Sequence, residues 1–230
     1  MLTPGKLIMC FEFFFITFAA YKNINMELKD RIIDEAGKLF VKHGIKRISM
    51  DEIASKLGIS KRTIYQNFKD KEDLLLQYLQ NLELMQIEYL KDLSKNEQTV
   101  VHVFLRSIEM HKDFDFFNVS FLDDVEKYYP KAKKELIDQQ NRGIFFIKQF
   151  LEEGMDQGVI RKDLNIEVVS YLLQDSSRTF VNATRLANKS FSNWELFFTS
   201  MINFIRGISS AEGIEIVDTF LTKYYSDINV

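Results

Sequence analysis

The sequence predicts an all-α protein with a small N-terminal helix-turn-helix domain followed by a larger helical bundle. Of its 230 residues, 46% are hydrophobic, only two are proline and nine are glycine. Such a composition suits long helices around a sizeable core. Apolar residues recur at helical spacing along most of the chain, and neither repeats nor low-complexity segments interrupt this pattern.

The first 25 residues, MLTPGKLIMCFEFFFITFAAYKNIN, do not fit this picture. Lys6 precedes an apolar run from Leu7 to Ala20, which Glu12 interrupts. The run resembles the core of a signal peptide and is too short to span a bilayer. The favoured interpretation is a start codon assigned too early, with Met26 as the true first residue. A helix that packs on the protein or touches a membrane surface is the next alternative, and export is the last.

A first amphipathic helix is expected directly after Met26. Its apolar residues lie three or four positions apart, and Gly44 ends it before a short connector. These apolar residues are Leu28, Ile32, Ala36, Leu39 and Phe40. We expect this helix to brace the pair of helices that follows.

The segment from Ser49 to Leu76 predicts two short helices joined by a tight turn and followed at once by a third. Ser49 and Glu52 have the spacing of a capping box, in which each residue satisfies a backbone N–H of the first turn. Gly58 can adopt the left-handed conformation that a helix exit needs. Ser60 is the expected N-cap of the next helix, Lys61–Phe68.

The helix after Ser60 has two different faces. Ile64 and Phe68, four residues apart, lie on one face and are expected to be buried. The opposite face offers cationic and amide donors from Arg62, Gln66 and Lys69, flanked by Thr63 and Tyr65. In a DNA major groove, arginine pairs with guanine and glutamine with adenine, while hydroxyl groups and lysines hold phosphates. The pattern therefore predicts a DNA-binding helix-turn-helix.

Three motifs make residues 26–78 resemble the N-terminal DNA-binding domain of the TetR family of bacterial regulators. They are the amphipathic helix ending in KHG, then ISMDEIASKLGIS, then TIYQNFKDKEDLL. The resemblance implies that the protein binds a double-stranded DNA operator. It places against DNA the residues Ser49, Lys61, Arg62, Thr63, Tyr65, Gln66, Asn67 and Lys71. Arg62 and Asn67 depart from the small residue and the histidine common in the family, so a relative's operator sequence does not transfer to this chain.

Charge is distributed unevenly along the chain. The net charge is −3, but residues 26–74 hold eleven Lys and Arg against nine Asp and Glu. A weakly basic head on an acidic body excludes a general polyanion binder. It fits a protein that binds DNA as a symmetric pair, in which each copy adds a few salt-sensitive phosphate contacts.

Seven further helices are expected near residues 71–94, 97–112, 117–129, 131–154, 165–187, 192–208 and 211–226. Residues 79–230 are thus expected to form a ligand-binding and dimerisation domain. The helix near 192–208 carries more apolar residues than one buried stripe requires: Trp194, Phe197, Phe198, Met201, Ile202, Phe204 and Ile205. One interpretation is a helix buried on all sides. The other, implied by the TetR resemblance, is a homodimer in which two late helices of each subunit form a four-helix bundle and hold the two heads over a palindromic operator.

The resemblance also implies a small-molecule effector whose binding releases the DNA, which would make the protein a repressor. The 21 phenylalanines favour an apolar or aromatic effector. Candidate ligand-binding residues at helical spacing are Tyr171, Gln174, Arg178 and Asn182. A polar network between helices or a dimer contact is the favoured alternative for these four.

Catalytic motifs are missing from the sequence, which has no G-x-S-x-G, P-loop or glycine-rich dinucleotide turn. Cys10 is the only cysteine, so neither an intrachain disulfide nor a cysteine-rich metal site is expected, and the protein fits a reducing cytoplasm. We therefore expect no enzyme activity, cofactor or metal. The alternatives to a DNA-binding regulator are a helical module that uses the same head to bind protein and, less favoured, a small-molecule enzyme.

Overall fold

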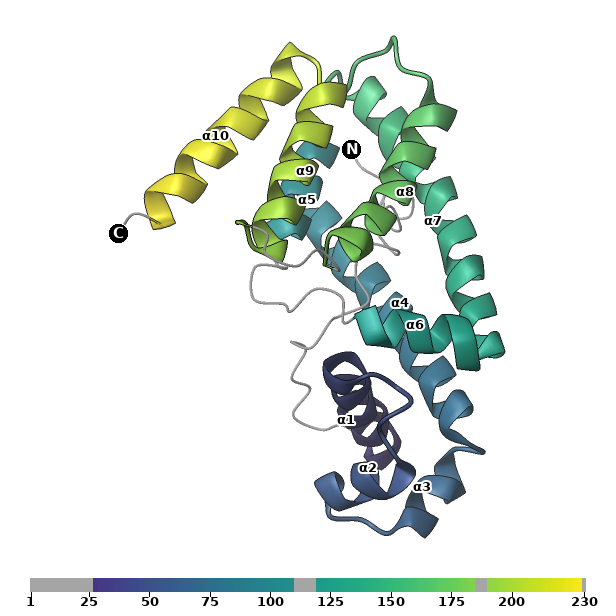
Figure 1. Ribbon diagram of the computed structural model, residues 1–230. Helices are drawn as coiled ribbons and strands as arrows, with labels where there is room; N and C mark the ends of the chain where they lie inside the picture. The colour runs from purple at the N-terminus through teal and green to yellow at the C-terminus, as the bar shows by residue number, and fades with distance from the viewer. Residues whose placement is uncertain (1–26, 110–118, 185–189, 229–230) are drawn as a thin grey trace. The chain divides into compact units, whose positions relative to one another are not determined.

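A computed structural model describes residues 27–109, 119–184 and 190–228, without the side chains of 119, 177–184 and 227–228. The N-terminal segment 1–25, including Cys10, lies outside these ranges. The described residues form ten helices and no strand (Figure 1), which confirms the all-α prediction. The helices are α1 Leu28–His43, α2 Met50–Leu57, α3 Lys61–Asn67, α4 Lys71–Asn96, α5 Val100–Glu109, α6 Val119–Tyr128, α7 Pro130–Asp156, α8 Ile166–Thr184, α9 Asn193–Ile208 and α10 Ala211–Ile228. Within the described ranges, none of them is long and apolar enough to cross a membrane.

The seven helices predicted after the head correspond to α4 to α10. The largest difference at a helix start is at α5, which begins at Val100 rather than near residue 97. Thr99 explains this shift, because its hydroxyl accepts a hydrogen bond from the backbone N–H of His102 at 3.4 Å and so caps the helix. Pro130 occupies the first position of α7, where its missing N–H costs nothing.

The described residues divide into two compact units. One unit contains residues 27–85 and 119–140, and the other contains residues 86–109, 141–184 and 190–228. The predicted head of residues 26–78 falls in the first unit, which also takes in α6 and the start of α7. Its expected boundary near residue 78 stays a prediction.

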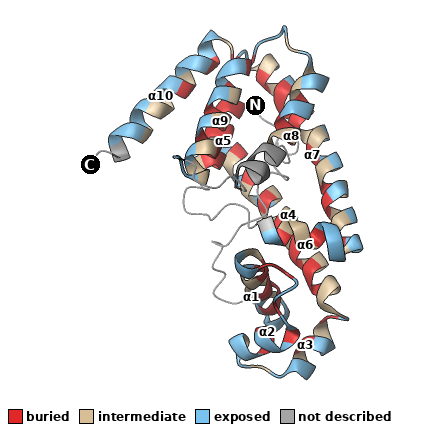
Figure 2. Cartoon of the chain, viewed as in Figure 1, coloured by how far each residue is buried: buried red, intermediate tan, exposed pale blue. Residues whose placement is uncertain are grey.

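The first unit is built on the apolar face of α1. Ile32, Ala36 and Phe40 have no exposed surface, and neither do Ile53 of α2 and Ile64 of α3 (Figure 2). Three helices thus share one core, and the predicted bracing role of α1 is confirmed. Leu28, the first of the apolar residues predicted for α1, lies at the helix start and is 38% exposed.

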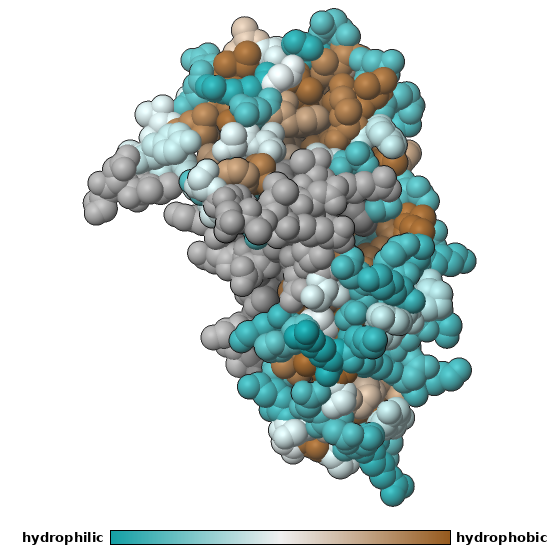
Figure 3. Space-filling view, in the orientation of Figure 1, coloured by the Kyte–Doolittle hydropathy of each residue, from teal (hydrophilic) through white to brown (hydrophobic). Residues whose placement is uncertain are grey.

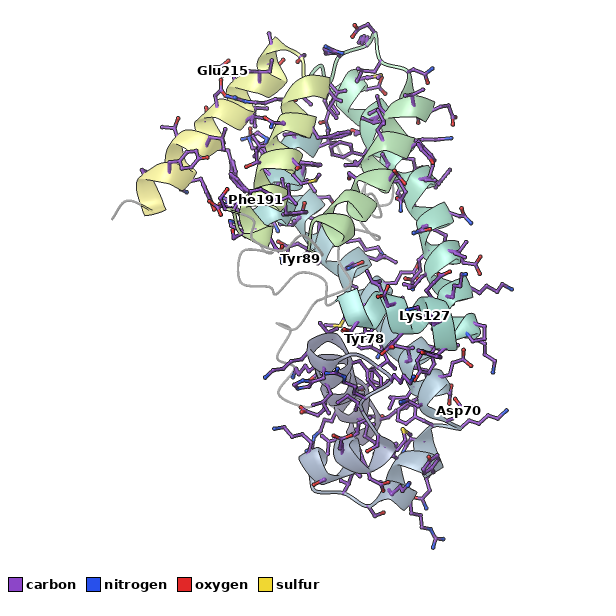
Figure 4. All side chains as sticks on the ribbon, viewed as in Figure 1. Asp70, Tyr78, Tyr89, Lys127, Phe191 and Glu215 are labelled. Carbon is purple, nitrogen blue, oxygen red and sulfur yellow. The ribbon has the colours of Figure 1, made fainter. Side chains whose placement is uncertain are left out.

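Helix α1 packs closely against α4 at Gly37. A Cβ atom at this position would lie only 1.9 Å from the ring of Tyr78, a residue that Figure 4 labels on α4. Tyr78 is 8% exposed, and burial raises the pKa of its hydroxyl well above its ordinary value. The helices therefore pack at a distance that only glycine allows.

In the second unit, α9 is covered by helices of its own chain. Phe197 and Met201 are 1% exposed, and Phe198 stacks on Tyr224 of α10 with ring centroids 4.5 Å apart. The indole N–H of Trp194 donates to the Tyr224 hydroxyl at 3.2 Å. The apolar residues of α9 are therefore largely buried without a second subunit.

Main-chain hydrogen bonds hold the start of α10. The N–H of Arg161 donates to the carbonyl of Ile208, and the N–H of Ser210 donates to the carbonyl of Val159, both at 3.0 Å. These bonds flank an isolated antiparallel bridge between the α7–α8 and α9–α10 connections. A Cβ atom at Gly213 would lie 2.1 Å from the carbonyl oxygen of Val159, so α10 packs directly against that backbone.

We predict opposite effects for two helical Gly→Ala substitutions. Gly37→Ala should destabilise the protein, because the displaced Tyr78 ring costs about 1–3 kcal/mol, more than alanine gains in helix propensity. Gly207→Ala is the matched control, since nothing lies within 4 Å of its Cβ position, and it should stabilise by about 0.4–1 kcal/mol. Thermal unfolding followed by circular dichroism measures both, and a Gly37→Ala protein as stable as wild type would contradict the close packing.

Candidate DNA-binding surface

The turn between α2 and α3 is defined by local hydrogen bonds. The Ser49 hydroxyl accepts from the backbone N–H of Glu52 at 3.2 Å, while the Glu52 carboxylate accepts from the backbone N–H of Ser49 at 2.7 Å. These two bonds complete the predicted capping box, and the hydrogen bonds from Ser49 lower the pKa of Glu52. Gly58 ends α2 in the left-handed conformation, with φ 67°, as expected.

Helix α3 is capped by Ser60 and anchored by two buried side chains, Ile64 and Phe68. The Ser60 hydroxyl accepts from the N–H of Thr63 at 3.0 Å and so caps the start of the helix. Ile64 is fully buried and Phe68, in extended conformation just after the helix, is 1% exposed. The predicted helix extended to Phe68, whereas α3 ends at Asn67. Burial of these two side chains turns the remaining side chains of α3 outward.

Three of the eight side chains expected to contact DNA are exposed and free of bonds. They are Arg62, Tyr65 and Gln66, for which the described part of the chain offers no hydrogen bond or ion pair. Tyr65 is 47% exposed. A guanidinium, a phenol and an amide thus project together from one short helix.

Four others are bonded within the head. Besides Ser49, the ammonium of Lys61 lies 2.6 Å from the carboxylate of Asp51, which raises the pKa of the lysine. The Thr63 hydroxyl bonds to that of Ser60, and the Asn67 amide donates to the carbonyl of Thr63 at 2.8 Å. These groups must share or exchange their partners to contact DNA.

The eighth residue, Lys71, is directed towards the loop between α1 and α2. Its ammonium donates to the carbonyl oxygens of Ile45 at 2.9 Å and of Ile48 at 2.8 Å. Burial lowers the pKa of Lys71, and the nearby carboxylates of Asp124 and Glu52 oppose that shift. Lys71 therefore differs from the free side chains of α3, because its ammonium is already bonded to main-chain carbonyl groups.

Two acidic residues that contribute to this surface were missed by the sequence analysis. Asp51 pairs with Lys61 across the helix-turn-helix. Asp124 of α6 accepts a hydrogen bond from the backbone N–H of Lys46 at 2.7 Å, and the Lys46 ammonium lies 4.4 Å from the ring centroid of Tyr128. Asp124 and Tyr128 lie about 80 residues from Lys46 in the chain, and no local pattern announces such a contact.

Of the four residues predicted to bind an effector, the structure describes the side chains of two, Tyr171 and Gln174. Tyr171 is 59% exposed, whereas Gln174 is buried at 9%. The side chains of Arg178 and Asn182 lie outside the described residues. Although both residues lie on α8, Tyr171 is therefore exposed and Gln174 is buried.

A groove of about 470 Å³ lies between α5 and α10, in the second unit. Its apolar lining comes from Leu105, Ile216 and Phe220, and its charged lining includes Arg106 and Glu215, which Figure 4 labels on α10. Neither of the two described candidates, Tyr171 and Gln174, lines this groove. Among the described residues, no group of His, Cys, Asp and Glu could hold a metal ion.

Comparison with known proteins identifies the head. The family described as "Bacterial regulatory proteins, tetR family" matches residues 32–78, which contain every side chain discussed for α2 and α3. An HTH-type transcriptional regulator of Staphylococcus aureus strain bovine RF122 is 35% identical over 123 residues, covering 49% of this chain and 65% of the relative. A regulator from strain USA300 is 33% identical over 119 residues and is covered to 64%. The match thus spans slightly less than two thirds of these relatives.

Solved structures share the fold of most of the chain. A transcriptional regulator from Saccharomonospora viridis, solved with choline, has a TM-score of 0.67 at 21% identity and covers 79% of this chain and 97% of its own. The regulator FadR from Bacillus subtilis, solved with stearoyl-CoA, has a TM-score of 0.59 at 19% identity, with 78% and 98% covered. At such identities the likeness concerns the fold alone. Residues 32–78 thus match the tetR family of bacterial regulatory proteins, and most of the chain shares its fold with solved transcriptional regulators.

Proposed function

We propose that this protein is a transcriptional regulator that binds a double-stranded DNA operator through the exposed face of α3. The observation that carries the proposal is the set of free side chains, Arg62, Tyr65 and Gln66, on a helix anchored by Ile64 and Phe68. Arginine and glutamine supply the bidentate donors that read guanine and adenine in a major groove. Tyrosine can hold a phosphate at the edge of the groove. Such a protein acts where the DNA is, in the cytoplasm.

A helical module that binds protein through the same head is the alternative. Protein interfaces usually centre on a buried apolar or aromatic anchor. The side of the helix-turn-helix seen in Figure 3 is largely hydrophilic, and on α3 only Tyr65 would provide such an anchor. The polar character of this surface favours DNA.

A homodimer is the proposed active form. On α8, Val168, Tyr171 and Leu172 are 52%, 59% and 56% exposed and lie three and four residues apart, so they form one apolar stripe. Such a stripe, left uncovered by the described part of the chain, is typical of a surface that another subunit covers. Two heads related by a twofold axis would read a palindrome with half-sites about one DNA turn apart.

The regulator is further proposed to be a repressor that a small molecule releases from DNA. The groove between α5 and α10 has a volume in the range of small-molecule sites, with an apolar floor from Ile216 and Phe220. Two proteins with this fold have been solved with a ligand, one with choline and one with stearoyl-CoA. Both observations support an effector with an apolar or aromatic part.

Selection of bound DNA from a random pool tests operator binding. We expect a palindromic sequence, and we expect Arg62→Ala to weaken binding to that sequence by about fivefold to 150-fold, because a bidentate base contact contributes about 1–3 kcal/mol. Arg161→Ala, which removes an exposed arginine from the α7–α8 connection, should leave binding unchanged. Fluorescence anisotropy at several salt concentrations measures both variants. Failure to select any sequence, or equal binding by Arg62→Ala, would reject the proposal.

The dimer is tested by placing a charge on the stripe of α8. Leu172→Glu should shift the protein from dimer to monomer in analytical ultracentrifugation at micromolar concentration, because a carboxylate cannot be buried unpaired at an interface. Ile137→Glu, at an exposed apolar position of α7, is the control and should remain dimeric. A wild-type protein that sediments as a monomer would refute the dimer itself.

Effector release is tested by competition. A compound that binds the proposed regulator should raise its melting temperature and lower its affinity for the selected DNA, since it binds the released form preferentially. Screening amphiphilic and aromatic compounds by both measurements checks this expectation. Compounds that raise the melting temperature and leave DNA affinity unchanged would argue against release.

A further inference from the structure

The loop between α1 and α2 determines where the helix-turn-helix begins. It runs from Gly44, which ends α1, to Ser49, which caps α2. Within it, Ile45 is 0% and Ile48 5% exposed, so both residues belong to the core of the head. Their carbonyl groups lie outside any helix. Beyond the N–H of Ile48, which donates to the Ile45 carbonyl at 3.3 Å, they need hydrogen-bond donors from outside the loop.

The ammonium of Lys71 supplies these donors. It lies 2.9 Å from the carbonyl oxygen of Ile45, 2.8 Å from that of Ile48 and 3.5 Å from that of Lys46. An ammonium has three donors in a compact arrangement, and here they meet the oxygens of a single loop. The ring centroid of Tyr129 lies 5.8 Å from the same nitrogen, within the range of a cation–π contact.

The same loop is also held from α6. The backbone N–H of Lys46 donates to the carboxylate of Asp124 at 2.7 Å, and the Lys46 ammonium donates to the hydroxyl of Tyr128 at 3.1 Å. The loop therefore has its carbonyl groups bound by Lys71 and one of its N–H groups bound by Asp124. Carbonyl and N–H groups of the loop are thus both bonded to residues of the first unit.

We propose that Lys71 is a positioning residue, which holds the α1–α2 loop and through it the start of α2, and that it does not contact a DNA phosphate. This proposal rests on the proposed operator binding. It replaces the role that the family resemblance implies for this lysine.

The cost of moving the ammonium supports this role. A lysine that turned to a phosphate would leave the carbonyl group of Ile48 without its donor, and that of Ile45 with only the 3.3 Å bond from the N–H of Ile48. An unsatisfied buried carbonyl costs more than the net gain of an average hydrogen bond. Lys69, two residues earlier, is exposed and has no side-chain bond in the described part of the chain. A phosphate contact from this end of α3 would cost less at Lys69.

The first test compares Lys71→Met with Lys69→Met, since both remove one positive charge. We expect Lys71→Met to speed hydrogen exchange of the amides of residues 45–49 and to weaken operator binding while the protein is still folded. The salt dependence of binding should keep its wild-type slope, because no phosphate contact is lost. Lys69→Met should leave loop exchange unchanged.

A phosphate contact predicts a different result for Lys71→Met. The slope of log affinity against log salt would fall by about 0.9, with no change in loop exchange. That outcome would overturn the proposal, and so would a variant that matches wild type in both measurements.

Lys71→Arg provides the second test and guards against a misfolded methionine variant. Arginine keeps the charge and binds phosphate well, but its planar guanidinium does not fit a half-buried site shaped for an ammonium. We expect it to weaken operator binding and speed loop exchange as Lys71→Met does. Binding as tight as wild type would overturn the proposal. If the wild-type protein bound no DNA, operator binding would fail by itself, and loop exchange would still decide whether Lys71 holds the loop.

Discussion

The exposed face of α3, which is proposed to bind DNA, depends on the burial of apolar side chains between helices that are too short to be stable alone. Helix α2 has 8 residues and α3 has 7, whereas an isolated helix shorter than about 12 residues is marginal in water. Their stability comes from the burial of Ile53 and Ile64, which like Phe40 of α1 have no exposed surface. The close contact at Gly37 then joins α1 to α4. This core sets the position of the α3 backbone and therefore the face from which its exposed polar side chains project.

Local signals of the sequence predicted most of the fold. The capping box at Ser49, the left-handed Gly58 and the first position of Pro130 each depend on a few neighbouring residues, and the structure has all three. The bonds of Lys71 and Asp124 depend on residues 23 to 78 positions away. Their partners are defined only once the helices have packed, so no pattern of neighbours announces them.

The site could be predicted as a region and only partly as a set of roles. Resemblance to a family transfers positions, but the state of each side chain depends on its neighbours in this chain. Lys61 has an acidic partner in Asp51, and Asn67 bonds to its own helix. A group that is already bonded gains less from a new partner than a free one.

In the bundle, α9 is likewise covered by α10. The packing of these two helices follows from tertiary contacts and not from helical periodicity.

The attachment of α10 has a consequence for how this protein can vary. Its start is held by bonds between backbone groups, by the Ser210 hydroxyl, which donates to the carbonyl of Gly158 at 2.6 Å, and by Gly213, where only the smallest residue fits. Residues of α10 such as Glu215 and Phe220, which face the groove with α5, take no part in that attachment. Substitutions among them can therefore change the chemistry of the groove while the helix stays in place, so that related chains could acquire different ligands on an unchanged scaffold.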